Sequence, residues 1–220
     1  MRSLTIPAAG DELPAVVADL HEPDSSPLAA VVLAHGAGGD RNAAILRAYA
    51  DEFCARGLLV ARIDLPYRQQ RPKGPPSPSR AAVDRAGIRR AMAQVRDLAG
   101  GIPLIVGGHS YGGRQASMVV AEDGGRLTDG LFLSSYPLHP PGKPERLRTE
   151  HLPQITVPTV VVHGRTDPFA SADELAAAVA LIDAPTRIVT VAAPHALNPA
   201  KTDVARLAAD AVMDVIVDPA

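Results

Sequence analysis

Short apolar runs alternate along the chain with stretches in which apolar residues recur at helical spacing. The run 28–34 is apolar throughout, which suits a strand covered on both faces, as in a parallel sheet. Strands are predicted at residues 3–7, 14–20, 28–34, 58–65, 102–106, 129–134, 158–162 and 186–192. Helices are predicted at residues 41–55, 80–98, 114–122, 171–181 and 202–215, and Asp40 is a candidate cap of the first.

This order of elements predicts an α/β fold. The first two strands, joined by a turn-rich link at residues 8–12, are expected to pair antiparallel. The remaining strands alternate with helices, which predicts a mostly parallel sheet of about eight strands with helices on both faces. The proline-rich segment 66–79 is expected to lack regular structure, and a second proline-rich connection covers residues 136–153. Because ligands bind beyond the carboxyl ends of parallel strands, polar residues that directly follow strands are the candidate site residues.

Composition narrows the possible functions. The 220 residues predict one domain, 1–220, and a net charge of −2 with 3% aromatic residues and no tryptophan argues against nucleic acid as a partner. The single cysteine, Cys54, excludes an intrachain disulfide and a cysteine-cluster metal site, and no metal or cofactor is predicted. No apolar stretch is long enough to span a bilayer and the N-terminus lacks a signal-peptide pattern, so a cytoplasmic protein without membrane contact is expected. The oligomeric state is not predicted.

The turn between the strand 102–106 and the helix 114–122 carries a serine between glycines, Gly108-x-Ser110-x-Gly112. A tight turn that lifts a serine to the tip of a strand strains the backbone. It also brings the strand and the helix close together, so only very small residues fit on both sides of the serine. This strand–turn–helix context predicts a nucleophile elbow with Ser110 as the nucleophile. An incidental glycine turn is the alternative.

A serine hydroxyl needs a base to take its proton, and the base needs a partner that fixes its tautomer. Asp167 follows the strand 158–162, and His195 follows the strand 186–192. The order serine, acid, histidine on successive strand-end loops predicts a catalytic triad of Ser110, Asp167 and His195. Taken singly, Asp167 is also compatible with an ordinary Asp-Pro turn and His195 with a surface-loop histidine.

These residues resemble those of the α/β-hydrolases, and the chain is similar to the dienelactone-hydrolase-like serine hydrolases over about residues 28–216. Dienelactone hydrolases proper use a cysteine where this chain has Ser110. The stretches 62–68, 136–144 and 163–167 resemble a branch of predicted hydrolases that includes a testis-expressed protein and a subunit of a histone-acetyltransferase-associated complex.

The resemblance implies a role for each site residue. His195 is expected to act as general base and Asp167 to orient it. The backbone N–H groups of Tyr111 and Ala37 are expected to form the oxyanion hole, with Gly38 as the alternative to Ala37. The glycines of the loop 36–39 give it the freedom to aim an amide inward.

Four residues are candidate substrate contacts: Gly38, Tyr67, Arg68 and Tyr136. The basic residues between Arg68 and Arg80 are candidates for binding an anionic substrate group, and solvated loop charge is the alternative. The segment 136–153 is short for the position where this fold often inserts a lid, so no cap domain is expected. His35, His109 and His163 are predicted to be structural rather than catalytic.

Together these features predict a serine hydrolase that cleaves small-molecule esters or thioesters through an acyl-enzyme. Two alternatives stay open at this point. One is a catalytically silent interaction module with the same fold, and the other is an acyltransferase that uses the same triad.

Overall fold

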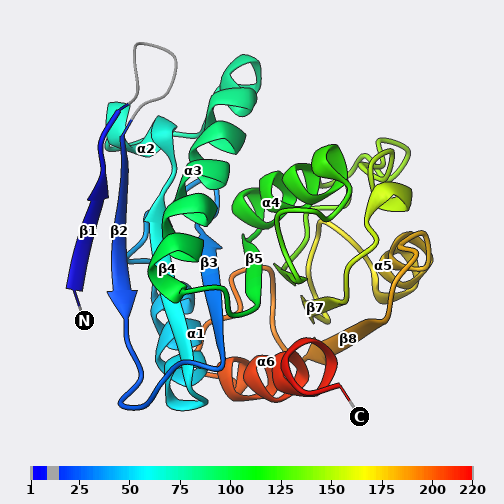
Figure 1. The fold of residues 1–220 in the computed structure, drawn as a ribbon. Coiled ribbons are helices and arrows are strands. Elements are labelled where there is room, and N and C mark those ends of the chain that lie inside the picture. The colour runs from blue at the N-terminus through cyan, green and yellow to red at the C-terminus, as the bar shows by residue number, and fades with distance from the viewer. Residues whose placement is uncertain (1, 9–14, 220) are drawn as a thin grey trace.

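The computed structural model describes residues 2–8 and 15–219, which contain one eight-stranded sheet (Figure 1). Its order is β1-β2-β4-β3-β5-β6-β7-β8, with β1 antiparallel to β2, β2 antiparallel to β4, and every later pair parallel. The strands are β1 (Arg2–Ile6), β2 (Val16–His21), β3 (Ala29–Ala34), β4 (Leu58–Asp64), β5 (Leu104–His109), β6 (Gly130–Ser134), β7 (Thr159–Gly164) and β8 (Thr186–Val191). The predicted mostly parallel sheet with an antiparallel N-terminal pair is confirmed.

Helices cover both faces of the sheet, as predicted. They are α1 (Ala44–Ala55), α2 (Pro66–Gln70), α3 (Ala81–Ala99), α4 (Tyr111–Asp123), α5 (Ala172–Val179) and α6 (Val204–Val212), and a π-helical turn, Met213–Val217, follows α6. One apolar cluster joins α3, α4 and α5 to the first face, and a second joins α1 and α6 to the other (Figure 1). Every residue of β3, β4 and β7 is buried, which explains the unbroken apolar sequence of β3 and the largely apolar sequences of the other two.

The local structure differs from the sequence prediction at two places. The segment 66–79, expected to be irregular, opens with α2, because Pro66 occupies the first helical turn, where its missing N–H costs no hydrogen bond. The helix predicted from residue 41 begins at Ala44, and Asp40 does not cap it. The Asp40 carboxylate instead accepts a hydrogen bond from Asn42 N (2.7 Å) in the turn before the helix. The predicted link at residues 8–12 lies almost wholly outside the described residues.

The connection from β6 to β7 contains no inserted domain. Residues 135–158, all of them described, contain one 3-10 turn, Leu152–Gln154, and are otherwise irregular. The expectation that the fold has no cap domain agrees with this connection.

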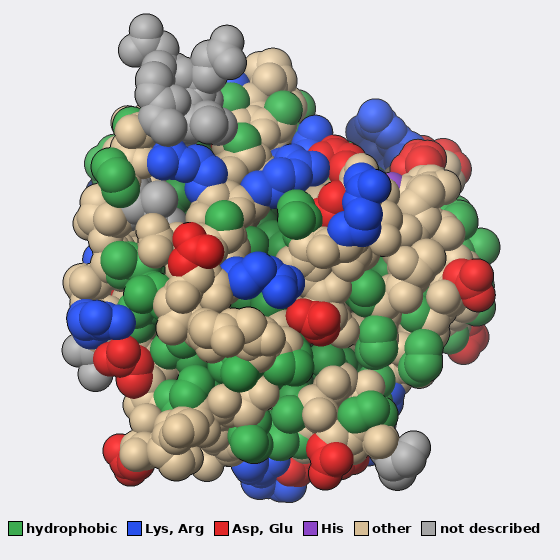
Figure 2. Space-filling model, in the orientation of Figure 1, with side chains coloured by type: hydrophobic (Ala, Val, Ile, Leu, Met, Phe, Trp, Pro, Cys, Tyr) green, Lys and Arg blue, Asp and Glu red, His purple; other side chains and the backbone are tan. Residues whose placement is uncertain are grey.

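None of the helices within residues 2–8 and 15–219 combines the length and the apolar character needed to span a bilayer. On the face drawn in Figure 2, basic and acidic side chains are interspersed, and the described residues form no continuous basic stripe there.

Candidate active site

Ser110 sits at the tip of the turn between β5 and α4. Its backbone has φ 51° and ψ −115°, a strained conformation for a residue with a side chain. Ser110 N donates to Ser134 O (2.7 Å), and Arg114 N donates to Ser110 O (2.9 Å). The strained residue is therefore held between the end of β6 and the first turn of α4.

The glycines on either side of the serine are required by close backbone contacts. A Cβ on Gly108 would lie 2.1 Å from Ala34 O, and one on Gly112 would lie 2.4 Å from the same oxygen. Gly108 also has φ +155°, which L side chains rarely adopt. Both glycines thus let the turn pass against the end of β3, the steric reason expected for the motif.

The three predicted triad residues lie in one hydrogen-bonded chain. His195 Nε2 is 2.9 Å from Ser110 Oγ, and His195 Nδ1 is 2.7 Å from Asp167 Oδ2. With a proton on Nδ1, His195 donates to the carboxylate and its Nε2 accepts from the serine hydroxyl. This is the arrangement in which an imidazole can take a proton from serine.

Asp167 is held so that its carboxylate faces His195. Phe169 N donates to Asp167 Oδ1 (2.9 Å), while Asp167 N donates to Gly164 O (3.0 Å). The Asp167 side chain is fully buried, whereas 22% of the His195 side chain is exposed. The acid is therefore shielded from water and the base is open to it.

His195 is fixed from two further sides. Ser135 Oγ donates to His195 O (2.8 Å), which ties the β8 loop to the end of β6. The ring of Phe169 lies 4.3 Å from the His195 ring, at an interplanar angle of 35°. These contacts restrict the orientation of the imidazole.

The two predicted oxyanion donors lie beside Ser110. Ala37 and Tyr111 both line the cavity that Ser110 opens into. Tyr111 is the first residue of α4, where backbone N–H groups have no partner within the helix. Gly38, the alternative donor and a candidate substrate contact, is exposed and does not line this cavity.

Tyr67 and Arg68, predicted as substrate contacts, are buried and contact the loop 36–39 instead. Tyr67 OH donates to Ala37 O (2.9 Å). Arg68 donates from Nε to Gly39 O (2.7 Å) and from Nη2 to Ala37 O (3.1 Å). Neither side chain lines the cavity, because their polar atoms are used to hold this loop.

Tyr136, the fourth predicted substrate contact, is also buried. Its hydroxyl donates to Arg148 O (2.5 Å), within the proline-rich connection that follows β6. Tyr136 is not among the residues that line the cavity, and its contact is with the backbone of Arg148, which does line it.

Asp84 was not singled out from the sequence, yet it links two parts of the site. Its carboxylate accepts from Tyr67 N (3.0 Å) and from Tyr111 OH (2.7 Å), and the residue is 1% exposed. Burial raises the pKa of Asp84, and these two hydrogen bonds oppose that rise. The sequence held a signal for it, since Asp84 interrupts the apolar stripe of α3 four residues before Ile88.

The histidines next to the site have mainly structural contacts. His35 is fully buried, and its ring nitrogens contact Gly36 O (2.8 Å) and Leu65 N (3.1 Å). His163 Nε2 lies 3.0 Å from Ala170 O. Burial, with a contribution from His195, lowers the pKa of His109 from 6.5 to about 4.

His109, which is half-buried, makes stability depend on pH. Between pH 6.5 and about 4 the unfolded chain binds a proton that folded His109 does not, so stability falls as pH falls through this window. At pH 5 this one group is expected to cost about 2 kcal/mol of unfolding free energy. We expect His109→Gln to lose correspondingly less stability than wild type between pH 7 and 5, measured by urea unfolding. An equal loss in both proteins would contradict the assignment.

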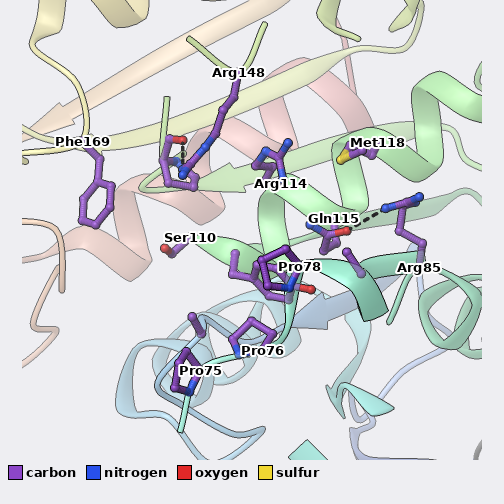
Figure 3. Close-up of a pocket in the computed structure, with 14 residues that line it drawn as sticks. Pro75, Pro76, Pro78, Arg85, Ser110, Arg114, Gln115, Met118, Arg148 and Phe169 are labelled. Carbon is purple, nitrogen blue, oxygen red and sulfur yellow. Dashed lines mark hydrogen bonds between the residues drawn. The ribbon is translucent and has the colours of Figure 1, made fainter. Parts of the chain in front are cut away.

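The cavity beside Ser110 has a volume of about 590 Å³, a size typical of small-molecule sites (Figure 3). Its lining includes Pro75, Pro76 and Pro78 from the segment after α2, and Tyr111, Arg114, Gln115 and Met118 from α4. Phe169 stands beside Ser110, and Met118 lies farther along α4 (Figure 3).

Comparisons with known proteins agree with this architecture. The profile of the alpha/beta hydrolase domain matches residues 27–217. An alpha-beta serine hydrolase homologue from Coxiella burnetii is 14% identical, with a TM-score of 0.76 over 95% of this chain and 96% of that one. A dienelactone hydrolase from Anabaena variabilis is 20% identical (TM-score 0.75, 98% of both chains). Est1E from Butyrivibrio proteoclasticus is 14% identical (TM-score 0.78, 97% and 98%). At 14–20% sequence identity, the structural similarity shows a shared fold alone.

Proposed function

The chain belongs to the alpha/beta hydrolase domain family, and we propose that it is a serine hydrolase that cleaves small-molecule esters or thioesters. The observation that carries the proposal is the chain of hydrogen bonds from Asp167 through His195 to Ser110, at 2.7 and 2.9 Å. The strained elbow that presents Ser110 to a cavity supports it, because residues with strained backbones cluster at active sites.

In the first half of the proposed reaction, Ser110 Oγ attacks the carbonyl carbon as its proton passes to His195 Nε2. Asp167 stabilises the imidazolium that forms. The backbone N–H groups of Tyr111 and Ala37 stabilise the oxyanion. The imidazolium then gives its proton to the departing alcohol or thiol, the bond to that group breaks, and an acyl-enzyme remains.

In the second half, a water molecule gives a proton to His195 and attacks the acyl carbon. The bond to Ser110 Oγ breaks, the serine regains its proton from His195, and a carboxylic acid leaves. The exposed face of His195 supports access for this water. Product analysis with added alcohols would separate hydrolysis from acyl transfer to an acceptor other than water.

Labelling with a fluorophosphonate tests the proposal directly. We expect one covalent adduct on the wild-type protein by intact-mass spectrometry and none on Ser110→Ala. Ser79→Ala, which alters an exposed serine away from the triad, serves as the matched control and should label fully. Equal labelling of wild type and Ser110→Ala, or labelling of neither, would overturn the proposal and favour an interaction module with the same fold.

Arg68 is expected to position the oxyanion hole. Its guanidinium holds Ala37 O and Gly39 O, so its loss should let the Ala37 amide move away from the oxyanion. We expect Arg68→Met to lower kcat roughly 10- to 100-fold with little change in KM, because the oxyanion forms only in the transition state.

A lysine at this position keeps the charge and some of the contacts, so Arg68→Lys should recover part of kcat. The matched control is Lys73→Met, which removes an exposed cation from the segment that follows α2 and should leave kcat unchanged. Unfolding curves at the assay temperature show whether each variant is folded. A rise in KM with unchanged kcat would contradict the positioning role.

A further inference from the structure

Three arginines line the cavity beside Ser110: Arg85, Arg114 and Arg148. Arg85 is paired, since its Nε lies 2.8 Å from Glu122 Oε1. Within residues 2–8 and 15–219, neither Arg114 nor Arg148 has a carboxylate at ion-pair distance. Two positive charges therefore face the cavity without a counter-ion from the described protein.

The groups packed around these two arginines do not neutralise them. The Tyr136 hydroxyl lies close to both side chains, but burial raises the pKa of Tyr136 to about 12, so it stays neutral near pH 7. His151 is a second titratable neighbour, and burial together with Arg114 lowers its pKa to about 4, so it is neutral as well. The carboxylates of Glu150 and Glu122 also act on His151, but Glu122 is paired with Arg85 and Arg89. Arg148 Nη1 donates to Pro137 O (2.8 Å), an uncharged acceptor.

Two hydrogen-bond donors on this wall have no acceptor. Arg114 Nε and Gln115 Nε2 are buried and unpartnered within the described part of the chain. Gln115 is fully buried, and its Oε1 accepts from Arg85 Nη1 (3.2 Å), which leaves the amide nitrogen without a partner. Buried unpaired donors are costly, so a small shift of these side chains toward an acceptor in the cavity would be favourable.

The distance between Ser110 and Arg114 suits a charged group on a substrate whose carbonyl lies at Ser110. Arg114 lies one helical turn beyond Ser110, between Ser110 and Met118 along α4, and Arg148 reaches in from the connection after β6 (Figure 3). Four residues of helix rise correspond to about 6 Å, which is within the length of a small ester. The remaining lining is mainly apolar, from Phe169, Met118 and four prolines.

We propose that Arg114 and Arg148, with Gln115, bind a carboxylate carried by the ester substrate, so that the natural substrates are small anionic esters or thioesters. This inference rests on the proposed function and names its substrate class. Guanidinium groups match carboxylates with paired, charge-assisted hydrogen bonds. An apolar spacer joins the carboxylate to the reacting carbonyl and lies against the prolines that line the cavity.

Matched pairs of esters test the preference, one pair for each position of the carboxylate. Monomethyl adipate is compared with methyl hexanoate for a carboxylate on the acyl side. The ester 4-acetoxybenzoate is compared with methyl 4-acetoxybenzoate for one on the alcohol side. In at least one pair we expect kcat/KM to be about tenfold or more higher for the anionic ester.

Arg114→Met should lower kcat/KM for the preferred anionic ester about tenfold more than for its neutral partner. Arg114→Lys should recover part of the preference. Arg146→Met is the matched control, because Arg146 is exposed in the same connection as Arg148 and lies outside the cavity lining. No preference for the anionic ester in either pair, or a preference that survives Arg114→Met, overturns the inference.

Calorimetry with the Ser110→Ala protein separates this inference from the proposed function. This variant should bind the anionic ester more tightly than its neutral partner whether or not turnover occurs, and Ser110→Ala combined with Arg114→Met should not. Hydrolysis of neutral and anionic esters at equal rates would leave the hydrolase proposal standing and remove the carboxylate site. Selective binding of the anionic ester without hydrolysis of either ester would support the carboxylate site and contradict the hydrolase proposal. Equal binding of both esters overturns the inference.

Discussion

Replacing Ser110 with alanine should reduce ester hydrolysis about 10,000- to 1,000,000-fold. The effect is large because the alanine variant cannot form an acyl-enzyme, and only the oxyanion donors and the cavity remain to help water attack. The fold should be unaffected, since the backbone contacts of Ser110 with Ser134 and Arg114 do not use the hydroxyl. Initial rates with a chromogenic ester, corrected for background hydrolysis, measure the loss.

The other two triad members should behave as parts of the same unit. His195→Ala is expected to cost about as much as Ser110→Ala, and the double variant should lose little more than either single variant. Asp167→Asn should also lower kcat, because an amide at that position no longer favours the tautomer with a proton on Nδ1.

Circular dichroism and urea unfolding of each variant serve as the control for folding. Additive losses in the Ser110, His195 double variant would mean that the two side chains act independently. Such a result would contradict the triad even though the atoms lie 2.9 Å apart.

Replacing Gly108 with alanine should have the largest effect on stability. The new Cβ would lie 2.1 Å from Ala34 O, a backbone atom in a strand that cannot move aside, and φ at this position is +155°. We expect a loss of about 3–5 kcal/mol in unfolding free energy, or failure to fold, because overpacking and backbone strain act together.

Gly38→Ala is the matched control for this substitution. A Cβ on Gly38 would meet nothing within 4 Å, so its unfolding free energy should stay within about 0.5 kcal/mol of wild type. Urea unfolding of both variants makes the comparison. A Gly108→Ala protein as stable as wild type would show that the turn adopts another backbone path.

Much of this fold could be predicted from the sequence because its signals are local. An unbroken apolar run marks a strand that is buried on both faces, as β3 is. The spacing of glycines around Ser110 predicts a tight turn, because the residues that must be small there are within a few positions of the serine. Because parallel strands end at one edge, the loops carrying Asp167 and His195 could be assigned to that edge before their distances were known.

The boundaries and roles of the proline-rich segments could not be predicted in the same way. Pro66 allows a helix only because of its place in the first turn, which composition does not reveal. Tyr67 and Arg68 were expected to meet substrate, yet they point into the protein and hold the loop 36–39. The direction of such side chains depends on what packs against them from distant parts of the chain.

The sequence by itself determined the order of elements, the turn that presents Ser110 and the edge of the sheet where the site lies, since each follows from spacing along the chain. Only the tertiary structure decided which charges face the cavity. Arg114 lies in a helix and Arg148 in a loop, and nothing local distinguishes them from the paired Arg85. Whether a charge is neutralised depends on which carboxylate the fold brings within reach, and that is set by contacts between segments far apart in sequence.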